Sequence, residues 1–212
     1  MEPLNLVPEL IREMQDRLGC HSVILYGSLA RGVSDAASDI DLVGFRDIAQ
    51  TFREAGWRQG LYVDLFIYST GQAADEAMLC VRGGKVLCQR DSFGDDFLER
   101  LERVFQLGPV PLPDYEKRAR KVWAFKMLAR ARKDDPEGHY RRSWLLTALL
   151  EDYFRLRDQW YLGPKQSFKI LREKDLDTDA AFAAALEPGA DLQRLEELVK
   201  RVTGEVEPSA LA

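Results

Sequence analysis

The sequence predicts an α+β fold in two parts, a small mixed β-sheet domain over residues 1–107 and an α-helical bundle over residues 108–212. Three observations support this prediction. Runs rich in β-branched and aromatic residues are confined to the first half, whereas the second half consists of long stretches with helical periodicity. Between the halves, Pro109, Pro111 and Pro113 interrupt the chain, and such a stretch continues neither a helix nor a central strand.

The first half alternates between helical and strand patterns. A helix is expected from about Pro8 to Leu18, because proline suits a first turn and an apolar stripe leads up to a glycine stop. Three strands are expected, with the sequences SVILY (22–26), DIDLVGF (39–45) and GLYVDLFIY (60–68). Between the last two strands, DIAQTFREAG (47–56) has a short helical pattern. The expected remainder comprises helices over about 72–81 and through 97–104, with a short strand over 85–88 between them.

The second half is predicted to hold five helices and no strand. Leu145 and Leu149 belong to a stripe at helical spacing that is expected to face the core of a bundle. The tail from Gly204 onward is expected to fray. The five helices are expected over residues 114–135, 139–163, 165–175, 177–187 and 191–202.

Composition narrows the class of protein. Of the 212 residues, 46% are hydrophobic and 31% are charged, which is typical of a folded globular protein and excludes intrinsic disorder and collagen-like repeats. No window approaches the roughly 18 uninterrupted apolar residues of a membrane span, so no membrane partner is expected. The N-terminal residues resemble neither a signal peptide nor a transit peptide. Cys20, Cys80 and Cys88 match no disulfide framework or zinc pattern, which predicts thiols in a reducing cytoplasm.

The net charge of −5 is unevenly distributed. Residues 1–107 contain 11 Lys or Arg and 17 Asp or Glu, whereas residues 108–212 contain 19 and 18. A mildly acidic chain without an extended basic track is not expected to bind extended nucleic acid, which argues against template-dependent polymerisation.

The most informative stretch is LYGSLARGVSDAASDIDLV, residues 25–43. A strand is expected to end at Tyr26, and Gly27 and Ser28 then form a tight turn into a short helix. Glycine lets the backbone approach a bulky anion, and amides at a new helix start point toward it. Ser28 adds a hydroxyl donor and Arg31 adds a cation. By itself this pattern is a weak phosphate-binding signal.

Two acidic residues strengthen the signal. Asp39 and Asp41 lie two apart on a predicted strand, so their carboxylates are expected on one side of the sheet. Like charges at a half-buried position repel unless a cation lies between them, and hard oxygen ligands suit Mg²⁺. Asp64 lies within an apolar run and completes a three-carboxylate site if its strand pairs beside the first. The alternative interpretation is a solvated face or a turn.

With these residues the sequence resembles the nucleotidyltransferase superfamily that includes DNA polymerase beta, the poly(A) polymerases and the antibiotic nucleotidyltransferases. The family pattern is a hydrophobic residue before Gly-Ser, about a dozen residues to a D-x-D, and a third acid on a later strand. The match covers roughly residues 22–70. The form GSLARG…SDIDL most resembles the small bacterial branch with aminoglycoside and lincosamide nucleotidyltransferases. The matching positions are Gly27, Ser28, Asp39, Asp41 and Asp64.

The resemblance implies transfer of a nucleoside monophosphate from a nucleoside triphosphate, expected to be ATP, to an acceptor hydroxyl. It implies that Asp39 and Asp41 hold one Mg²⁺ on the triphosphate and that a second Mg²⁺ is shared with Asp64. Asp64 or another carboxylate would remove the hydroxyl proton. The remaining nucleotide contacts are expected from the Gly27–Ser28 turn, Arg31 and Ser38.

The helical half is expected to contribute to the nucleotide and acceptor cleft. Residues 114–142 carry 10 Lys or Arg against 5 Asp or Glu, an excess that either faces the triphosphate or is simply solvated. Antibiotic nucleotidyltransferases place a lysine from the helical region on the triphosphate, and Lys165 is the candidate here. Glu151 is a candidate base or acceptor-binding residue, with an ordinary exposed acid as the alternative.

These features lead to three hypotheses. The leading one is an Mg²⁺-dependent nucleotidyltransferase acting on a small hydroxylated acceptor, such as an antibiotic. The second is a protein AMP-transferase of the antitoxin-like minimal type, and the third is a catalytically silent nucleotide-binding regulator. The chain is expected to act as a monomer or a homodimer.

Overall fold

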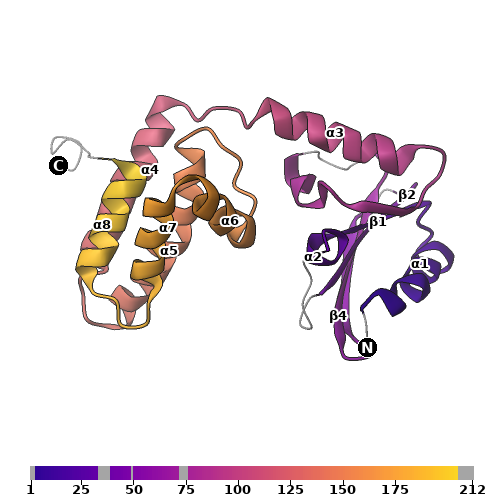
Figure 1. Cartoon of the computed structure of the whole chain (residues 1–212), viewed down its shortest axis with the longest axis horizontal. Coiled ribbons are helices and arrows are strands. Elements are labelled where there is room, and N and C mark those ends of the chain that lie inside the picture. The colour runs from indigo at the N-terminus through magenta and orange to yellow at the C-terminus, as the bar shows by residue number, and fades with distance from the viewer. Residues whose placement is uncertain (1–2, 33–38, 49, 72–75, 205–212) are drawn as a thin grey trace. The chain divides into compact units, whose positions relative to one another are not determined.

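The computed structural model describes residues 3–32, 39–48, 50–71 and 76–204, and the chain divides into two compact units, 1–107 and 108–212. The division falls at the position of the proline-rich seam in the sequence. Each unit has its own hydrophobic core, and each is described by itself (Figure 1).

The first unit is built on a five-stranded mixed sheet. Its strand order is β3-β4-β2-β1-β5, with β2 and β4 parallel and the other neighbouring pairs antiparallel. The predicted strands over 22–26, 39–45, 60–68 and 85–88 are therefore confirmed within a residue or so. The strand bounds are β1 Ser22–Tyr26, β2 Ile40–Arg46, β3 Phe52–Arg58, β4 Leu61–Ser69 and β5 Lys85–Cys88.

Helices cover both faces of this sheet. Helix α1 (Val7–Asp16), preceded by the 3₁₀ turn η1 (Pro3–Asn5), packs on one face. Gly44 of β2 allows this close packing, because a Cβ there would lie 2.6 Å from Met14 Cε on α1. On the other face, Val43 and Phe45 pack against η2 (Glu76–Val81) and α3 (Phe93–Leu107). The structure thus confirms the predicted helices near residues 8–18 and 97–104.

The helix predicted over 47–56 is wrong, because Phe52–Arg58 forms β3, an edge strand of the sheet. Burial alternates residue by residue along β3, as in a strand with one face packed. Gln59 and Gly60, both with positive φ, connect β3 to β4 by a two-residue hairpin turn. The helix predicted over 72–81 corresponds to η2 for residues 76–81, while 72–75 lie outside the described residues.

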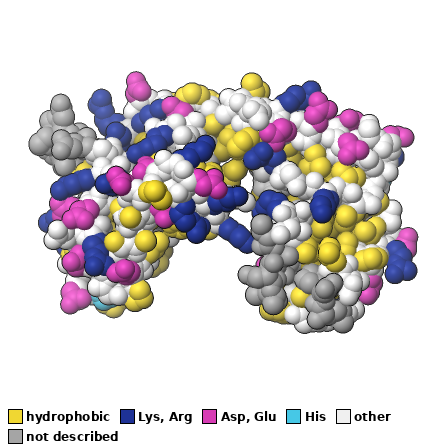
Figure 2. Space-filling model, in the orientation of Figure 1, with side chains coloured by type: hydrophobic (Ala, Val, Ile, Leu, Met, Phe, Trp, Pro, Cys, Tyr) yellow, Lys and Arg dark blue, Asp and Glu magenta, His cyan; other side chains and the backbone are white. Residues whose placement is uncertain are grey.

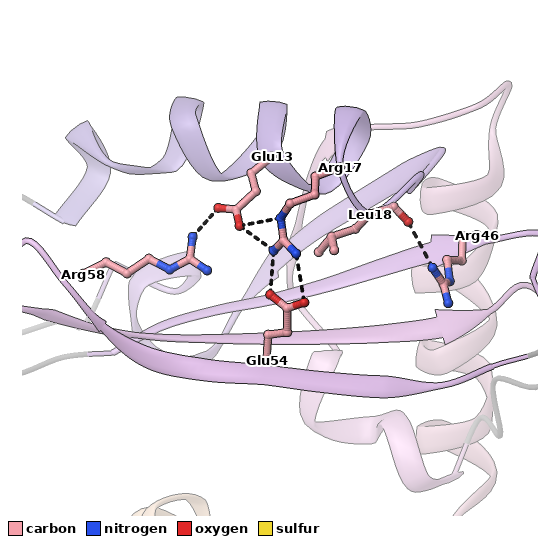
Figure 3. Close-up of polar contacts among 6 residues, drawn as sticks. All are labelled: Glu13, Arg17, Leu18, Arg46, Glu54 and Arg58. Carbon is pink, nitrogen blue, oxygen red and sulfur yellow. Dashed lines mark hydrogen bonds and ion pairs between the residues drawn. The ribbon is translucent and has the colours of Figure 1, made fainter.

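An ion-pair network joins β3 to α1 (Figure 3). Arg17, the residue that caps the C-terminal end of α1, donates to both oxygens of Glu54 on β3, at 3.1 and 2.6 Å, and also to Glu13. Arg58 on β3 donates to Glu13 in turn. These partly exposed pairs connect the edge strand to a separate element of the fold.

The second unit is the predicted five-helix bundle, and no strand occurs among its residues 108–204. Asp135, Asp175 and Asp191 each cap a helix by accepting a backbone N–H three residues on. Within the described residues, no helix is long and apolar enough to cross a membrane. The expected frayed tail beyond Gly204 lies outside them. The helices are α4 Asp114–Arg130, α5 Pro136–Arg155, α6 Pro164–Lys174, α7 Leu176–Leu186 and α8 Leu192–Thr203.

Candidate functional site

Two of the predicted site residues are direct neighbours in the sheet. In the parallel register of β2 and β4, Asp41 lies beside Asp64, and Tyr26 of β1 is opposite Asp41 on the other side. Asp41 alternates with the residues facing α1, so both carboxylates are on the face that α3 and η2 cover further along the strands. Asp39 immediately precedes β2 and is exposed. The condition that the sequence left open for Asp64, that its strand pairs beside that of Asp41, is met.

Gly27 forms the turn that the sequence predicts. The chain leaves β1 at Tyr26 and enters the short helix α2 (Gly27–Ala30), and Gly27 has a φ of 75°. A Cβ on Gly27 would lie 2.2 Å from Asp41 Oδ2, so a side chain here would displace the carboxylate. Glycine is therefore required for two reasons, the left-handed backbone and the close approach of Asp41.

The site carries more negative charge than its surroundings balance. The pKa of Asp41 is raised to about 6, mainly by burial and then by the neighbouring charges of Asp39 and Asp64, against weaker opposing effects of Arg31 and Arg53. No Lys or Arg of the described chain lies within ion-pair distance of Asp41. Burial, followed by the charge of Asp41, also raises the pKa of Tyr26. An additional cation would be stabilised at this position.

Asp64 has a cation already. Arg53 on β3 donates through Nε to Asp64 Oδ1 at 2.7 Å and through Nη2 to Oδ2 at 2.6 Å, a forked pair. The Asp64 side chain is 11% exposed and the Arg53 side chain 53%. Arg53 also lies over the ring of Phe66, 4.9 Å from its centroid. The sequence prediction missed Arg53 because its strand was interpreted as a helix, although Gly60 directly before the next strand is a turn signal.

The described residues fit a divalent cation only in part. No group of three or more His, Cys, Asp or Glu side chains in the described part of the chain is placed to hold one metal ion. Asp41, by contrast, lies in a space that a Cβ on Gly27 would fill, next to the charge of Asp39. These two carboxylates suit Mg²⁺, while Asp64 is engaged by Arg53.

Ser28 and Arg31 lie just after Gly27, along the short helix α2 and at its C-terminal end. Ser28 is half-buried on α2, and Arg31 is exposed at the C-terminal end of that helix. Ser38, the remaining predicted nucleotide contact of this unit, lies outside the described residues. The nucleotide-binding roles of all three stay predictions.

The two candidates in the helical unit have different environments. Lys165 is exposed in the first turn of α6. Glu151 on α5 is half-buried, with Arg120 Nη1 at 3.5 Å, while the same nitrogen lies 2.6 Å from buried Asp152. Burial raises the pKa of Asp152, opposed by Arg120. Glu151 thus has one long ion-pair contact on a partly exposed side chain, and the roles of Glu151 and Lys165 stay predictions.

The basic excess of residues 114–142 is partly neutralised within the bundle. Lys117 pairs with Asp158 at 2.7 Å, and Arg132 pairs with Glu196 at 3.3 Å. Figure 2 shows Lys and Arg side chains at several places over the visible face of this unit, with acidic side chains between them. These pairs favour the interpretation of a solvated, ion-paired surface over a dedicated triphosphate surface.

Comparison with solved structures gives a structural resemblance at low sequence identity. The chain is similar to the crystal structure of a nucleotidyltransferase-like protein from Exiguobacterium sibiricum 255-15, at 14% sequence identity and a TM-score of 0.44. The similarity covers 93% of this chain and 77% of the other. No family model and no curated protein matches the sequence. The functional proposal therefore depends on the geometry of the described residues.

Proposed function

We propose that this protein is an Mg²⁺-dependent nucleotidyltransferase that moves a nucleoside monophosphate, AMP in the first instance, from a nucleoside triphosphate to a hydroxyl of a small acceptor. One observation carries the proposal. The half-buried Asp41 carboxylate is packed against a turn that only glycine can form, and its pKa is raised by burial and by two neighbouring acids. A folded protein retains such unfavourable charge where a ligand relieves it.

The arrangement assigns a task to each residue. Asp39 and Asp41 would hold a divalent cation, which when bound neutralises phosphate charge in the transition state. Gly27 allows the backbone to approach the β- and γ-phosphates, and the Ser28 hydroxyl donates to a phosphate oxygen. Arg31 adds positive charge on the exposed side of the same turn.

Asp64 is the proposed proton acceptor. The acceptor oxygen attacks the α-phosphorus, the bond from that phosphorus to the oxygen bridging the α- and β-phosphates breaks, and pyrophosphate leaves. The proton of the attacking hydroxyl moves to the Asp64 carboxylate. In the helical unit, Lys165 is proposed to contact the triphosphate, and Glu151 is proposed to contact the acceptor.

The direct test is transfer of label from each α-labelled nucleoside triphosphate, with Mg²⁺, to a panel of hydroxylated small molecules. The Asp39→Asn/Asp41→Asn double variant is expected to lose transfer by about a thousandfold or more, because each carboxylate serves the charge of the reacting phosphates. Asp47→Asn, just beyond the other end of β2, is the matched control.

Equal transfer by the double variant and the wild type would contradict the site assignment. Label on a protein instead of a small molecule would favour the protein AMP-transferase. Tight nucleotide binding without release of pyrophosphate would favour a silent regulator.

A further inference from the structure

Asp41 and Asp64 are neighbours in the sheet, yet their partners differ. Asp64 accepts two hydrogen bonds from one guanidinium, that of Arg53. Among the described residues, no Lys or Arg lies within ion-pair distance of Asp41. A guanidinium that spans both carboxylate oxygens places its positive charge where a divalent cation would have to approach. Asp64 as arranged here is therefore blocked from joining Asp41 around a shared metal ion.

The Arg53–Asp64 ion pair contributes little to connecting separate elements of the fold. Arg53 lies diagonally across from Asp64 on β3 and β4, which are already paired by an antiparallel register from Phe52 to Arg58. On the opposite face of the same strand, Glu54 and Arg58 connect β3 to α1 (Figure 3). Within the described part of the chain, Arg53, in contrast, pairs only with a residue of the neighbouring strand β4.

The two members of the pair also differ in their freedom to move. The Asp64 side chain is 11% exposed, whereas the Arg53 side chain is 53% exposed and belongs to an edge strand. Arg53 can leave the carboxylate by rotating its own side chain toward solvent, with no change in the backbone. Asp64, once released, would be a buried carboxylate without its partner, and such a group attracts another cation or a proton.

We propose that Arg53 is an exchangeable counter-ion of Asp64, a positioning residue that must leave this carboxylate before Asp64 can bind a divalent cation or accept the acceptor's proton. The inference rests on the proposed function for the role of the carboxylates. It adds a separate claim, that Arg53 competes with the metal ion. Removing Arg53 therefore strengthens metal binding, whereas removing a residue that only supports the site would weaken it.

The experiment is a Mn²⁺ titration of the full chain without nucleotide, with free Mn²⁺ followed by electron paramagnetic resonance. Arg53→Gln is expected to bind Mn²⁺ about three- to tenfold more tightly than the wild type. The effect is modest because the Arg53–Asp64 ion pair that competes with the metal ion is partly exposed. Arg53→Lys keeps the positive charge but loses the forked pair of hydrogen bonds, so its Mn²⁺ affinity is expected to lie between those of the wild type and Arg53→Gln.

Two controls separate competition from other effects. Arg58→Gln removes an ion-paired arginine from the other face of β3 and is expected to leave the Mn²⁺ affinity unchanged. Asp64→Asn combined with Arg53→Gln is expected to abolish the gain. Circular dichroism establishes that each variant is folded.

The outcomes distinguish this inference from the proposed function. If Mn²⁺ binding depends on Asp41 but Arg53→Gln binds no more tightly than the wild type, the counter-ion claim is overturned and the proposed function stands. If neither the wild type nor Arg53→Gln binds Mn²⁺, the counter-ion claim is overturned, and the proposed function is decided separately by the transfer assay with nucleotide present. A gain that persists without Asp64 also overturns the counter-ion claim.

Discussion

The polar residues at the two ends of the β1–β2–β4 sheet differ in whether their charges and hydrogen bonds are balanced by neighbouring side chains. At the end where β2 finishes, His21 bonds Ser22 Oγ and Thr70 Oγ1, both at 2.8 Å, and Thr70 in turn bonds Asp47 Oδ1 at 3.0 Å. Arg90 completes the cluster by donating to Asp47. Each of these residues has partners in neighbouring chain segments. We call this cluster the closed end.

At the end where β2 begins, the acids face one another instead. Asp41 has acidic neighbours, and its pKa is raised to about 6, whereas Arg90 and Thr70 lower the pKa of Asp47 to about 2. We call this end, with Gly27, Asp39, Asp41 and Asp64, the open end. The contrast indicates that the closed end serves the fold, while the open end retains unfavourable charge that a ligand can relieve.

The largest expected effect comes from filling the space against Asp41. Gly27→Ala places a methyl group 2.2 Å from Asp41 Oδ2, so the carboxylate must move. Transfer is expected to fall by about a hundredfold or more, since small misplacements at a reacting centre have effects of that size. The measurement is the steady-state rate with saturating nucleotide.

Gly19→Ala is the matched control for this variant. Gly19 also has positive φ, but nothing lies within 4 Å of a Cβ there. It therefore carries the same backbone strain without the clash. Equal losses of transfer in the two variants would show that strain, and not the position of Asp41, explains the result.

A substitution at the closed end is expected to have the opposite effect, lowering stability while leaving transfer intact. Ser22 is fully buried, and its hydroxyl bonds both His21 and the backbone N–H of Arg90, the latter at 3.2 Å. Ser22→Ala is expected to lower the free energy of unfolding by about 1–3 kcal/mol, because buried partners lose a hydrogen bond. Denaturant unfolding measures this change. A large loss of transfer by the folded variant would contradict the division between the two ends.

The smallest expected effect is on the pH dependence of stability. The pKa of Asp41 is about 6 in the folded chain against 3.8 when unperturbed, so between these values the folded state binds the proton more readily. Asp41 therefore lowers the free energy of unfolding as pH rises through this range, and the loss is complete above it. Because Asp41 is only half-buried, Asp41→Asn is expected to stabilise the chain at pH 7 by about 1 kcal/mol.

The measurement for this prediction is thermal unfolding of the two proteins between pH 4 and 8. The difference between them should be near zero at the acid end and should grow as pH rises. A variant less stable than the wild type at pH 7 would show that the Asp41 charge is already compensated.

The sequence predicts the open end well where the signal is local. Gly27, Ser28, Asp39 and Asp41 lie within fifteen residues of one another, and Asp39 directly precedes the strand on which Asp41 is the second residue, so local spacing is enough to place these two acids near each other. Placing Asp64 beside Asp41 required the correct pairing of two strands, which the sequence could only state as a condition.

Arg53 could not be predicted once its strand was interpreted as a helix. Its partner is eleven residues away across a hairpin, and the pairing depends on the strand register. In the bundle, the helices follow from their periodicity. The environment of Glu151 was missed because Arg120 and Asp152 come together only when α4 packs on α5.

The decisive measurement for a nucleotide site at the open end is a crystal structure with Mg²⁺ and a non-hydrolysable ATP analogue. We expect a cation between Asp39 and Asp41, phosphates against the Gly27–Ser28 turn, and Arg53 no longer forked on Asp64. A nucleotide bound elsewhere, with Asp41 lacking any cation, would contradict this assignment.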